Sequence, residues 1–367
     1  SSDLTRLVIS GYYGFGNAGD EAMLAAILEA ILEVVPDADI TVISGNPGHT
    51  AANHGVKAIG RFDMFGILNA IGRCDLLISG GGSLLQDVTS KRSLYYYLSI
   101  ITLATSFGKR VMLYAQGIGP LRRKRARQIV GQVLNKVTMI TVRDERSKAE
   151  LLDMGVTKVP IQVTADAVLA MHPVDKTIGR RLLKPYQLSG VRYRVGVSVR
   201  NWKQSIAYRG ELAKALDRLH EELGAQVVFI PMQHPADTQE AMAIKSLMKS
   251  EPVVLERMYN TTELLALEGC MDVLIGVRLH ALVFASLMEK PVVGISYDPK
   301  ITNFLQMIGQ EPVGTLDEIE SDTIYAATAG FLENSALQQQ VVQRIIKLRE
   351  ESLKNAHIAL SLLDTPK

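Results

Sequence analysis

Arg278 and His280 lie two residues apart in GVRLHALVFASL, residues 276–287, where an apolar run leads into an apolar helical pattern. Charged side chains are seldom buried unless they are paired or take part in function. Core packing alone would favour Val and Leu at both positions. The pair therefore indicates a functional site at the point where a strand ends.

Other basic and polar side chains follow strand-like runs in the same half of the chain. They are Arg200 after VGVSV, Gln233 and His234 after VVFIPM, and Tyr297 and Lys300 after VVGIS. Arginine offers a planar fork that matches carboxylate and phosphate, and the amides of a helix N-terminus also attract anions. We therefore expect a crevice that binds a compact anion with several negative groups.

Each of these side chains, taken singly, also has an ordinary explanation. Arg200 could pair with a surface acid, His234 could be a loop residue, and Lys300 could be solvated. Arg278 and His280 are harder to explain in this way, because both stand within an apolar frame.

The first turn of the chain has the glycine spacing of a dinucleotide site, GFGNAG at residues 14–19. The next predicted strand ends without an acidic residue for a ribose, and the helix opens with Asp20 and Glu21, where a pyrophosphate needs positive potential. We therefore expect no dinucleotide. Asp20 either caps the helix or joins Asn17 in contacting a hydroxyl-rich ligand.

Two further glycine-rich turns, SGGGSLLQD at 79–87 and AQGIGP at 115–120, also follow predicted strands. Open α/β sheets bind ligands at these strand ends, and glycine lets the backbone approach a ligand closely. The polar side chains here are uncharged or acidic, which favours a sugar. The residues predicted to contact this sugar are Asn17, Asp20, Gly82, Ser83 and Gln116, with Asp87 as the base that acts on a hydroxyl.

Short β-branched runs alternate with segments of helical apolar spacing, a pattern typical of parallel sheets covered by helices. The predicted strands are 6–10, 39–44, 75–79, 110–115, 139–142 and 161–164, then 194–199, 226–230, 253–256, 272–275 and 291–296. The pattern pauses at 170–190, which we interpret as an inter-domain connection.

The predicted fold class is α/β, with two doubly wound Rossmann-like domains facing a cleft. We assign an N-terminal Rossmann-like domain to 1–172, a C-terminal Rossmann-like domain to 173–330, and a helix that packs on the body to 331–367.

Composition places the chain among ordinary globular proteins, with 367 residues, 47% hydrophobic and 21% charged. The net charge of +2 gives no signal for nucleic acid. Cys74 and Cys270 are predicted to be reduced core residues, and no signal peptide or membrane-spanning run is evident, so we expect a cytoplasmic protein. No metal-ligand spacing is evident, and we expect neither a metal nor a cofactor.

Six segments in order resemble the polysaccharide pyruvyl transferase family, particularly its CsaB-type cell-wall members. They are GYYGFGNAGDEAML, SGGGSLLQD, AQGIGP, TVRDERS, VSVRNW and IGVRLHA, and the resemblance covers about residues 6–300. It implies a GT-B-like fold, with the acceptor bound by the N-terminal domain 1–172 and the donor by the C-terminal domain 173–330, and with phosphoenolpyruvate as co-substrate. It also implies a pyruvate ketal on N-acetylmannosamine of a lipid-linked cell-wall precursor, a modification that serves S-layer anchoring.

The expected donor-binding residues are Arg200, Gln233, Arg278, Leu279, His280, Tyr297 and Lys300, with the Leu279 side chain turned into the core. Arg278 is expected to hold the donor. His280 is expected to protonate the methylene carbon or the leaving phosphate. Two alternatives remain open: a nucleotide-sugar-dependent glycosyltransferase that binds a diphosphate in the basic pocket, and a non-catalytic sugar- or phosphate-binding module.

A basic stretch from Arg122 to Arg127 lies at the start of a predicted helix. Its ordinary interpretation is a solvated face with acidic neighbours. The alternative is peripheral contact with anionic lipid at the inner face of the cell membrane, to which Tyr95, Tyr96 and Tyr97 could contribute.

Overall fold

The computed structural model describes residues 4–202 and 206–364, and the chain divides into two compact units. Unit 1 comprises Ser1–Met171 and Arg349–Lys367, and unit 2 comprises His172–Leu348. The predicted tail at 331–367 is therefore divided between the units, and its last three residues lie outside the described part of the chain.

Unit 1 contains a sheet of seven parallel strands within the described residues, in the order β3-β2-β1-β4-β5-β6-β7. The strands are β1 (Arg6–Ser10), β2 (Asp39–Ser44), β3 (Lys57–Gly60), β4 (Leu76–Ser79), β5 (Arg110–Gln116), β6 (Met139–Val142) and β7 (Ile161–Val163). Six of them are the predicted strands within one residue at each end. β3 was not predicted, because it is short and lies at the sheet edge with an exposed Lys57.

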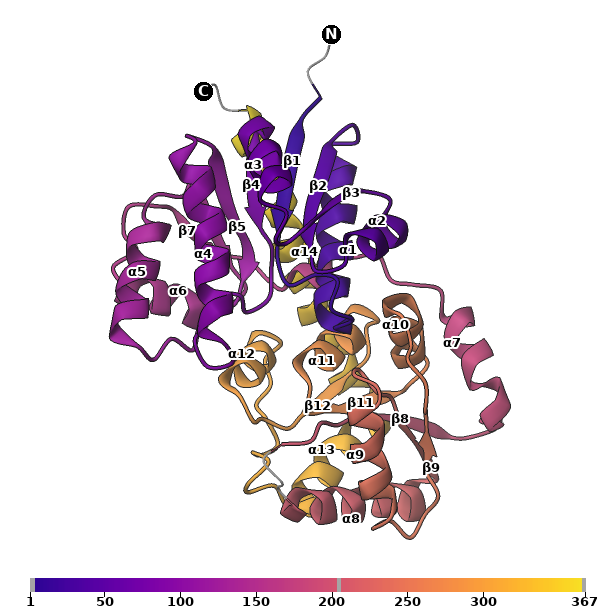
Figure 1. The fold of residues 1–367 in the computed structure, drawn as a ribbon. Coiled ribbons are helices and arrows are strands. Elements are labelled where there is room, and N and C mark those ends of the chain that lie inside the picture. Colours follow the sequence, from indigo (N-terminus) through magenta and orange to yellow (C-terminus); the bar gives the residue numbers. More distant parts are fainter. Residues whose placement is uncertain (1–3, 203–205, 365–367) are drawn as a thin grey trace. The chain divides into compact units, whose positions relative to one another are not determined.

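Helices cover both faces of this sheet (Figure 1). They are α1 (Ala18–Val34), α2 (Pro47–His54), α3 (Met64–Arg73), α4 (Lys91–Ser106), α5 (Lys124–Leu134) and α6 (Glu145–Asp153). Parallel strands are joined by right-handed crossovers, and the chain reverses its direction across the sheet after β3. It follows that α1 and α2 lie on one face and α3 to α6 on the other.

The long C-terminal helix α14 (Ser335–Asp364) begins in unit 2 and ends in unit 1. In unit 1 its Asn355 Oδ1 accepts hydrogen bonds from Thr141 Oγ1 at 2.5 Å and Thr164 Oγ1 at 3.0 Å. Ser352 Oγ donates to the backbone oxygen of Asp166 at 2.7 Å. Ser352 and Asn355 are both fully buried, so the last part of α14 belongs to the core of unit 1.

Unit 2 contains a parallel sheet of five strands in the described residues, in the order β10-β9-β8-β11-β12. The strands are β8 (Tyr193–Ser198), β9 (Ala225–Phe229), β10 (Val253–Val254), β11 (Val273–Gly276) and β12 (Val292–Gly294). The helices are α7 (Lys176–Leu183), α8 (Ile206–Leu223), α9 (Ala236–Lys245), α10 (Thr261–Gly269), α11 (Leu279–Leu287), α12 (Pro299–Met307) and α13 (Ser321–Glu333). All five strands were predicted, with small shifts at their ends.

The predicted connection at 170–190 contains structure of its own, because α7 lies within it and packs on α10. A Cβ atom added to Gly179 of α7 would lie 2.3 Å from the backbone oxygen of Ala266 on α10, so the two helices are in close backbone contact. No helix among the described residues is long and apolar enough to cross a membrane.

Glu268 on α10 is fully buried in unit 2. Burial raises the pKa of its carboxyl well above the usual value, and a backbone contact from Ala285 offsets only part of this effect. The side chain is therefore held in the protonated form at a pH where an exposed Glu would be ionised.

Glu268→Gln should change how the stability of unit 2 depends on pH. The unfolded carboxyl ionises near pH ~4.3, whereas the folded one keeps its proton, so the free energy of unfolding falls with rising pH by up to ~1.4 kcal/mol per pH unit. This loss continues until the raised pKa of the folded state is reached. Gln removes it, so the variant should gain stability relative to the wild type as the pH rises above about 4.5. Urea unfolding at several pH values measures the difference, and a difference independent of pH would contradict the assignment.

Candidate functional site

The strand order of unit 2 reverses between β8 and β11, which lie side by side in the centre of the sheet. Open α/β sheets bind ligands beside such a reversal, at the carboxyl ends of the strands. Arg200 comes two residues after β8, and Arg278 comes two residues after β11. Both predicted arginines are therefore placed at the reversal.

Arg278 is held by an acidic residue that the sequence did not identify. Its Nη2 lies 2.6 Å from Asp237 Oδ1 and 3.2 Å from Gln233 Oε1. Asp237 is only 1% exposed, and its Oδ2 accepts the backbone N–H groups of Met232 at 3.1 Å and Gln233 at 2.9 Å. Because a buried carboxylate needs such partners, Asp237 fixes both the turn after β9 and the direction of Arg278.

Arg200 points in the other direction across the sheet. Its Nη1 donates to Tyr297 Oη at 2.5 Å, and its Cζ lies 4.6 Å from the centre of the Tyr297 ring and 5.4 Å from that of Trp202. Lys300 Nζ is 5.7 Å from the centre of the same tyrosine ring. Arg200 thus reaches past β11 to the turn after β12, while Arg278 reaches past β8 to the turn after β9. The two guanidinium groups are therefore expected to pass each other above the central strand pair.

The backbone at Arg200 is anchored through α8 and α9. Tyr208 Oη donates to the backbone oxygen of Arg200 at 3.1 Å and also hydrogen bonds Glu240. Glu240 is buried and binds Arg209 through both oxygens at 2.8 Å. Asp237 and Glu240 are three residues apart, so one face of α9 supports both arginines of the site. The three-residue spacing of Asp237 and Glu240 in the helix that follows β9 is the sequence signal that could have identified them.

Leu279 and His280 are the first two residues of α11, and Arg278 occupies the N-cap position. The Leu279 side chain is buried, as predicted, so its backbone amide is the group it presents at the helix N-terminus. His280 is partly buried beside it. His234 is held to α9, since its Nδ1 lies 3.0 Å from Thr238 Oγ1.

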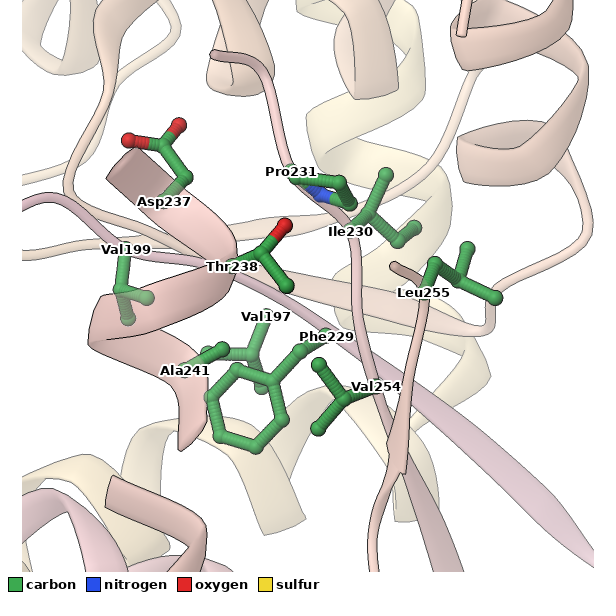
Figure 2. A pocket seen from close by; sticks show the side chains of 10 residues that line it. All are labelled: Val197, Val199, Phe229, Ile230, Pro231, Asp237, Thr238, Ala241, Val254 and Leu255. Carbon is green, nitrogen blue, oxygen red and sulfur yellow. The ribbon is translucent and has the colours of Figure 1, made fainter. Parts of the chain in front are cut away.

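A small apolar pocket lies between α9 and the ends of β8 and β9 (Figure 2). Its walls include Val197, Phe229 and Val254, and the carboxylate of Asp237 points away from them. This lining suits the packing of α9 on the sheet and does not suit an anion, so we assign no ligand to it.

In unit 1, Asn17 is the N-cap of α1. Its Oδ1 accepts the backbone N–H groups of Gly19 at 3.0 Å and Asp20 at 3.3 Å. The alternative that Asp20 caps this helix is therefore wrong. Glu21 accepts the N–H of Gly14 at 2.7 Å, so carboxylate and amide oxygens already surround the start of α1. This arrangement agrees with the expectation that no pyrophosphate binds there.

Gly82 and Ser83 of the triple-glycine turn lie beside charged groups. Gly82 has φ +93°, and a Cβ added to it would lie 3.3 Å from Asp20 Oδ1. Ser83 Oγ accepts a hydrogen bond from Arg143 Nη2 at 3.1 Å. Arg143 is buried, and a Cβ added to Gly117 would lie 2.4 Å from the same nitrogen. Arg143 belongs to the TVRDERS segment, but no feature of the sequence indicates its role.

Gln116 and Asp87 hold the glycine-rich turns in place. Gln116 is fully buried, and its Nε2 donates to the backbone oxygens of Ser79 at 3.1 Å and Gly80 at 3.0 Å. The Asp87 carboxylate accepts the backbone N–H groups of Arg122 and Arg123 at 3.0–3.1 Å. Acceptor contact by Gln116 and proton removal by Asp87 stay predictions, and the observed bonds give both side chains a positioning role.

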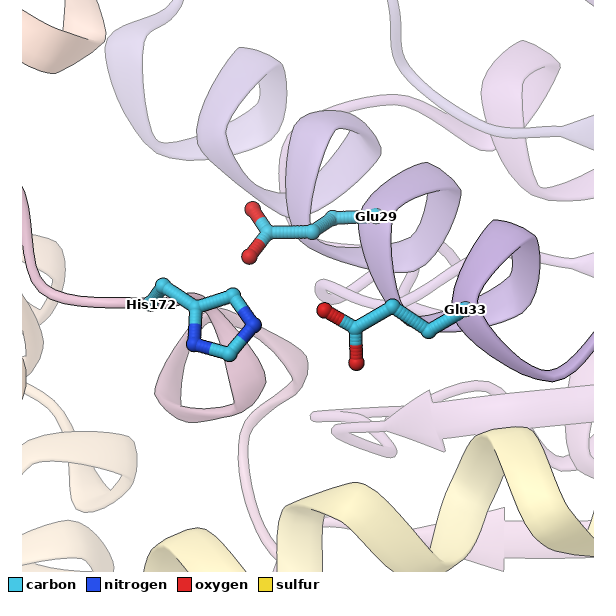
Figure 3. Close-up of side chains that lie close together, drawn as sticks. All are labelled: Glu29, Glu33 and His172. Carbon is cyan, nitrogen blue, oxygen red and sulfur yellow. The ribbon is translucent and has the colours of Figure 1, made fainter. Parts of the chain in front are cut away.

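Figure 3 labels three side chains that could serve as metal ligands. Glu29 and Glu33 lie one turn apart on α1, and His172 is the first residue of unit 2. The two acids belong to the second half of α1, towards the amino ends of the strands and away from the glycine-rich turns. Acidic groups of this kind are common without an ion, so they carry no metal assignment.

Comparisons with known proteins bear on both family and fold. The family model described as polysaccharide pyruvyl transferase matches residues 17–299. Amylovoran biosynthesis protein AmsJ from Erwinia amylovora is 22% identical over 402 residues, which covers 93% of this chain and 95% of that protein.

Solved structures with the same fold include a putative UDP-N-acetylglucosamine 2-epimerase from Listeria monocytogenes. It has a TM-score of 0.68 at 13% identity and covers 93% of this chain and 91% of its own. Anabaena HepE in complex with UDP-glucose has a TM-score of 0.64 at 12% identity, with 97% and 99% covered. These similarities confirm the predicted α/β fold class with two Rossmann-like domains of GT-B type.

Gly80→Ala tests the close packing beneath the triple-glycine turn. An added Cβ would lie 1.9 Å from Oη of the buried Tyr13, so we expect a loss of ~1–3 kcal/mol in the free energy of unfolding of unit 1. Tyr13→Phe removes the colliding atom and should recover part of that loss in the double variant. Gly72→Ala is the matched control, because nothing lies within 4 Å of its added Cβ. Equal stabilities of Gly80→Ala and Gly72→Ala would rule out this packing.

Proposed function

The chain belongs to the polysaccharide pyruvyl transferase family, and from this membership we propose that it transfers pyruvate as a ketal from phosphoenolpyruvate to a sugar. Membership itself supports a transferase that places pyruvyl groups on a polysaccharide. The identities of the donor, of the acceptor sugar and of its lipid linkage go beyond this membership and are our proposal. The acceptor we propose is N-acetylmannosamine of a lipid-linked cell-wall precursor, made at the cytoplasmic side of the membrane and used to anchor S-layer proteins.

The observation that carries the donor assignment is that Arg200 and Arg278 both follow strands at the reversal of unit 2, where Tyr297 and Asp237 hold their guanidinium groups. Phosphoenolpyruvate has a carboxylate and a phosphate on one small carbon skeleton, and two guanidinium forks with an adjacent Lys300 match that pair of anions. Asp237 and Tyr297 hold the two arginines before the ligand arrives, which lowers the entropy cost of binding. Gln233 and the first amides of α11 add uncharged donors at the same edge.

The reaction needs one proton on the methylene carbon of the donor and one on the departing phosphate. His280, at the start of α11, is proposed to protonate the carbon, which leaves positive character at C2. One sugar hydroxyl attacks C2 and phosphate leaves. A second hydroxyl of the same sugar closes the ketal. The two hydroxyl protons balance the new methyl hydrogen and the proton taken by phosphate, so the reaction needs no oxidant, reductant or further proton source.

The acceptor is proposed to bind at the glycine-rich turns of unit 1. Asn17 is exposed, Asp20 lies beside Gly82, and Ser83 is held by Arg143. Such a set of hydroxyl, amide and carboxylate groups suits sugar hydroxyls. Gln116 and Asp87 fix these turns from beneath.

The direct test is phosphate release from phosphoenolpyruvate in the presence of acceptor saccharides. We expect release that depends on an acceptor, with N-acetylmannosamine glycosides the best substrates, and no turnover of UDP-sugars. Turnover of a UDP-sugar without phosphate release would favour the glycosyltransferase alternative. Binding of phosphoenolpyruvate with no turnover of any acceptor would favour a binding module.

Arg278→Lys should lower kcat/KM for phosphoenolpyruvate about as strongly as Arg278→Ala. Lysine keeps the charge, but it loses the fork that meets Asp237 and Gln233 while facing the donor. Steady-state kinetics with varied phosphoenolpyruvate measure this effect. Near-normal kcat/KM in Arg278→Lys would show that the positive charge alone is sufficient and that the planar guanidinium group is not needed.

His280→Ala should lower kcat by ~10²–10⁴, because proton transfer to carbon would lose its donor. His357→Ala, at an exposed position of α14, serves as the matched control and should retain full activity. Rates with saturating phosphoenolpyruvate separate a loss of chemistry from weaker binding. A His280→Ala enzyme that keeps most of its kcat would assign the proton donor to another group.

A further inference from the structure

Helices α3, α4 and α5 begin at the same edge of unit 1. Each follows the carboxyl end of a parallel strand, and all three lie on the same face of the sheet. α3 contacts α4, and α4 contacts α5. The starts of these helices therefore lie along one edge of the sheet, which we call the rim, although they are far apart in sequence.

At the α3 end this rim is apolar and exposed. Phe62, Met64 and Phe65 are 75%, 60% and 87% exposed. The helix does not use these side chains for its own packing, because Ile67 and Ile71 are the α3 residues buried against the sheet. Large apolar side chains clustered in this way on a protein surface mark a binding site.

The α4 and α5 end of the rim is basic. Lys91 and Arg92 open α4, and residues 122–125 come just before α5 or at its start, all of them exposed. The first turn of α5 has no acidic residue, so its cations oppose the helix dipole and serve no need of the helix. Arg127 is different, because it pairs with Glu150 and Asp153. The side chain of Arg127 therefore has the acidic neighbours of the ordinary interpretation, whereas residues 122–125 are exposed.

We propose that this rim, consisting of residues 62–65, 91–92 and 122–125, binds the surface of an anionic lipid bilayer. The phenyl and thioether groups enter the boundary between head groups and acyl chains, and the cations lie on the anionic head groups. The side chains of Phe62, Met64 and Phe65 offer no donor or acceptor for a sugar. The adjoining positive charge complements anionic lipid. The inference uses unit 1 alone and does not depend on the proposed donor or acceptor.

The test is co-sedimentation of the full chain with vesicles of phosphatidylcholine, with and without phosphatidylglycerol, in the absence of substrates. The wild type should bind the anionic vesicles and lose affinity in high salt. Phe62→Ser/Phe65→Ser and Lys124→Glu/Arg125→Glu should each weaken binding about tenfold or more. Leu247→Ser/Met258→Ser is the matched control, because it removes two exposed apolar side chains of unit 2 and should not change binding.

Binding that is absent, equal on neutral vesicles, or unchanged in both rim variants would overturn the proposal. Self-association that Phe62→Ser/Phe65→Ser abolishes, seen by light scattering without vesicle binding, would assign the apolar rim to a second copy of the chain. Turnover of a short soluble acceptor is measured in parallel and should be unchanged in the rim variants. If the wild type does not turn over the soluble acceptor, this result counts against the proposed function but does not affect the vesicle-binding result.

Discussion

Both sheets consist of parallel strands, and this constraint determines where the chemistry can take place. When every strand runs in one direction, every turn from strand to helix meets its neighbours at one edge. In unit 2 this brings Arg200, Gln233, Arg278 and Tyr297 together from four separate strands. In unit 1 it brings together the glycine-rich turns and, beyond them, the starts of α3, α4 and α5.

Buried carboxylates hold the side chains and turns at these edges in fixed positions. Asp237 directs Arg278, Glu240 supports Arg200 through Tyr208, and Asp87 ties two glycine-rich turns together. A buried carboxylate is costly unless its oxygens are satisfied, so each one enforces the geometry of the groups around it. The basic site of unit 2 is thus prepared in advance by the acids behind it.

The sequence predicted the strands well because apolar β-branched runs report burial directly. It failed for β3, whose Lys57 and short length resemble a loop, and for α7, whose packing on α10 depends on a distant segment. It predicted which arginines stand at strand ends but not Asp237 or Arg143, because their partners depend on which strands become neighbours. The contacts of Gln116 Nε2 with the backbone oxygens of Ser79 and Gly80 could not be predicted either, because they depend on the neighbouring strand.

The path of α14 has a consequence for how the chain is made. Asn355 and Ser352 complete the buried hydrogen bonds of Thr141, Thr164 and Asp166, yet they are synthesised after all of unit 2. During translation, unit 1 therefore lacks the Asn355 and Ser352 partners of those groups until unit 2, which is inserted between its two segments, has emerged. The first unit to leave the ribosome is the last to be finished.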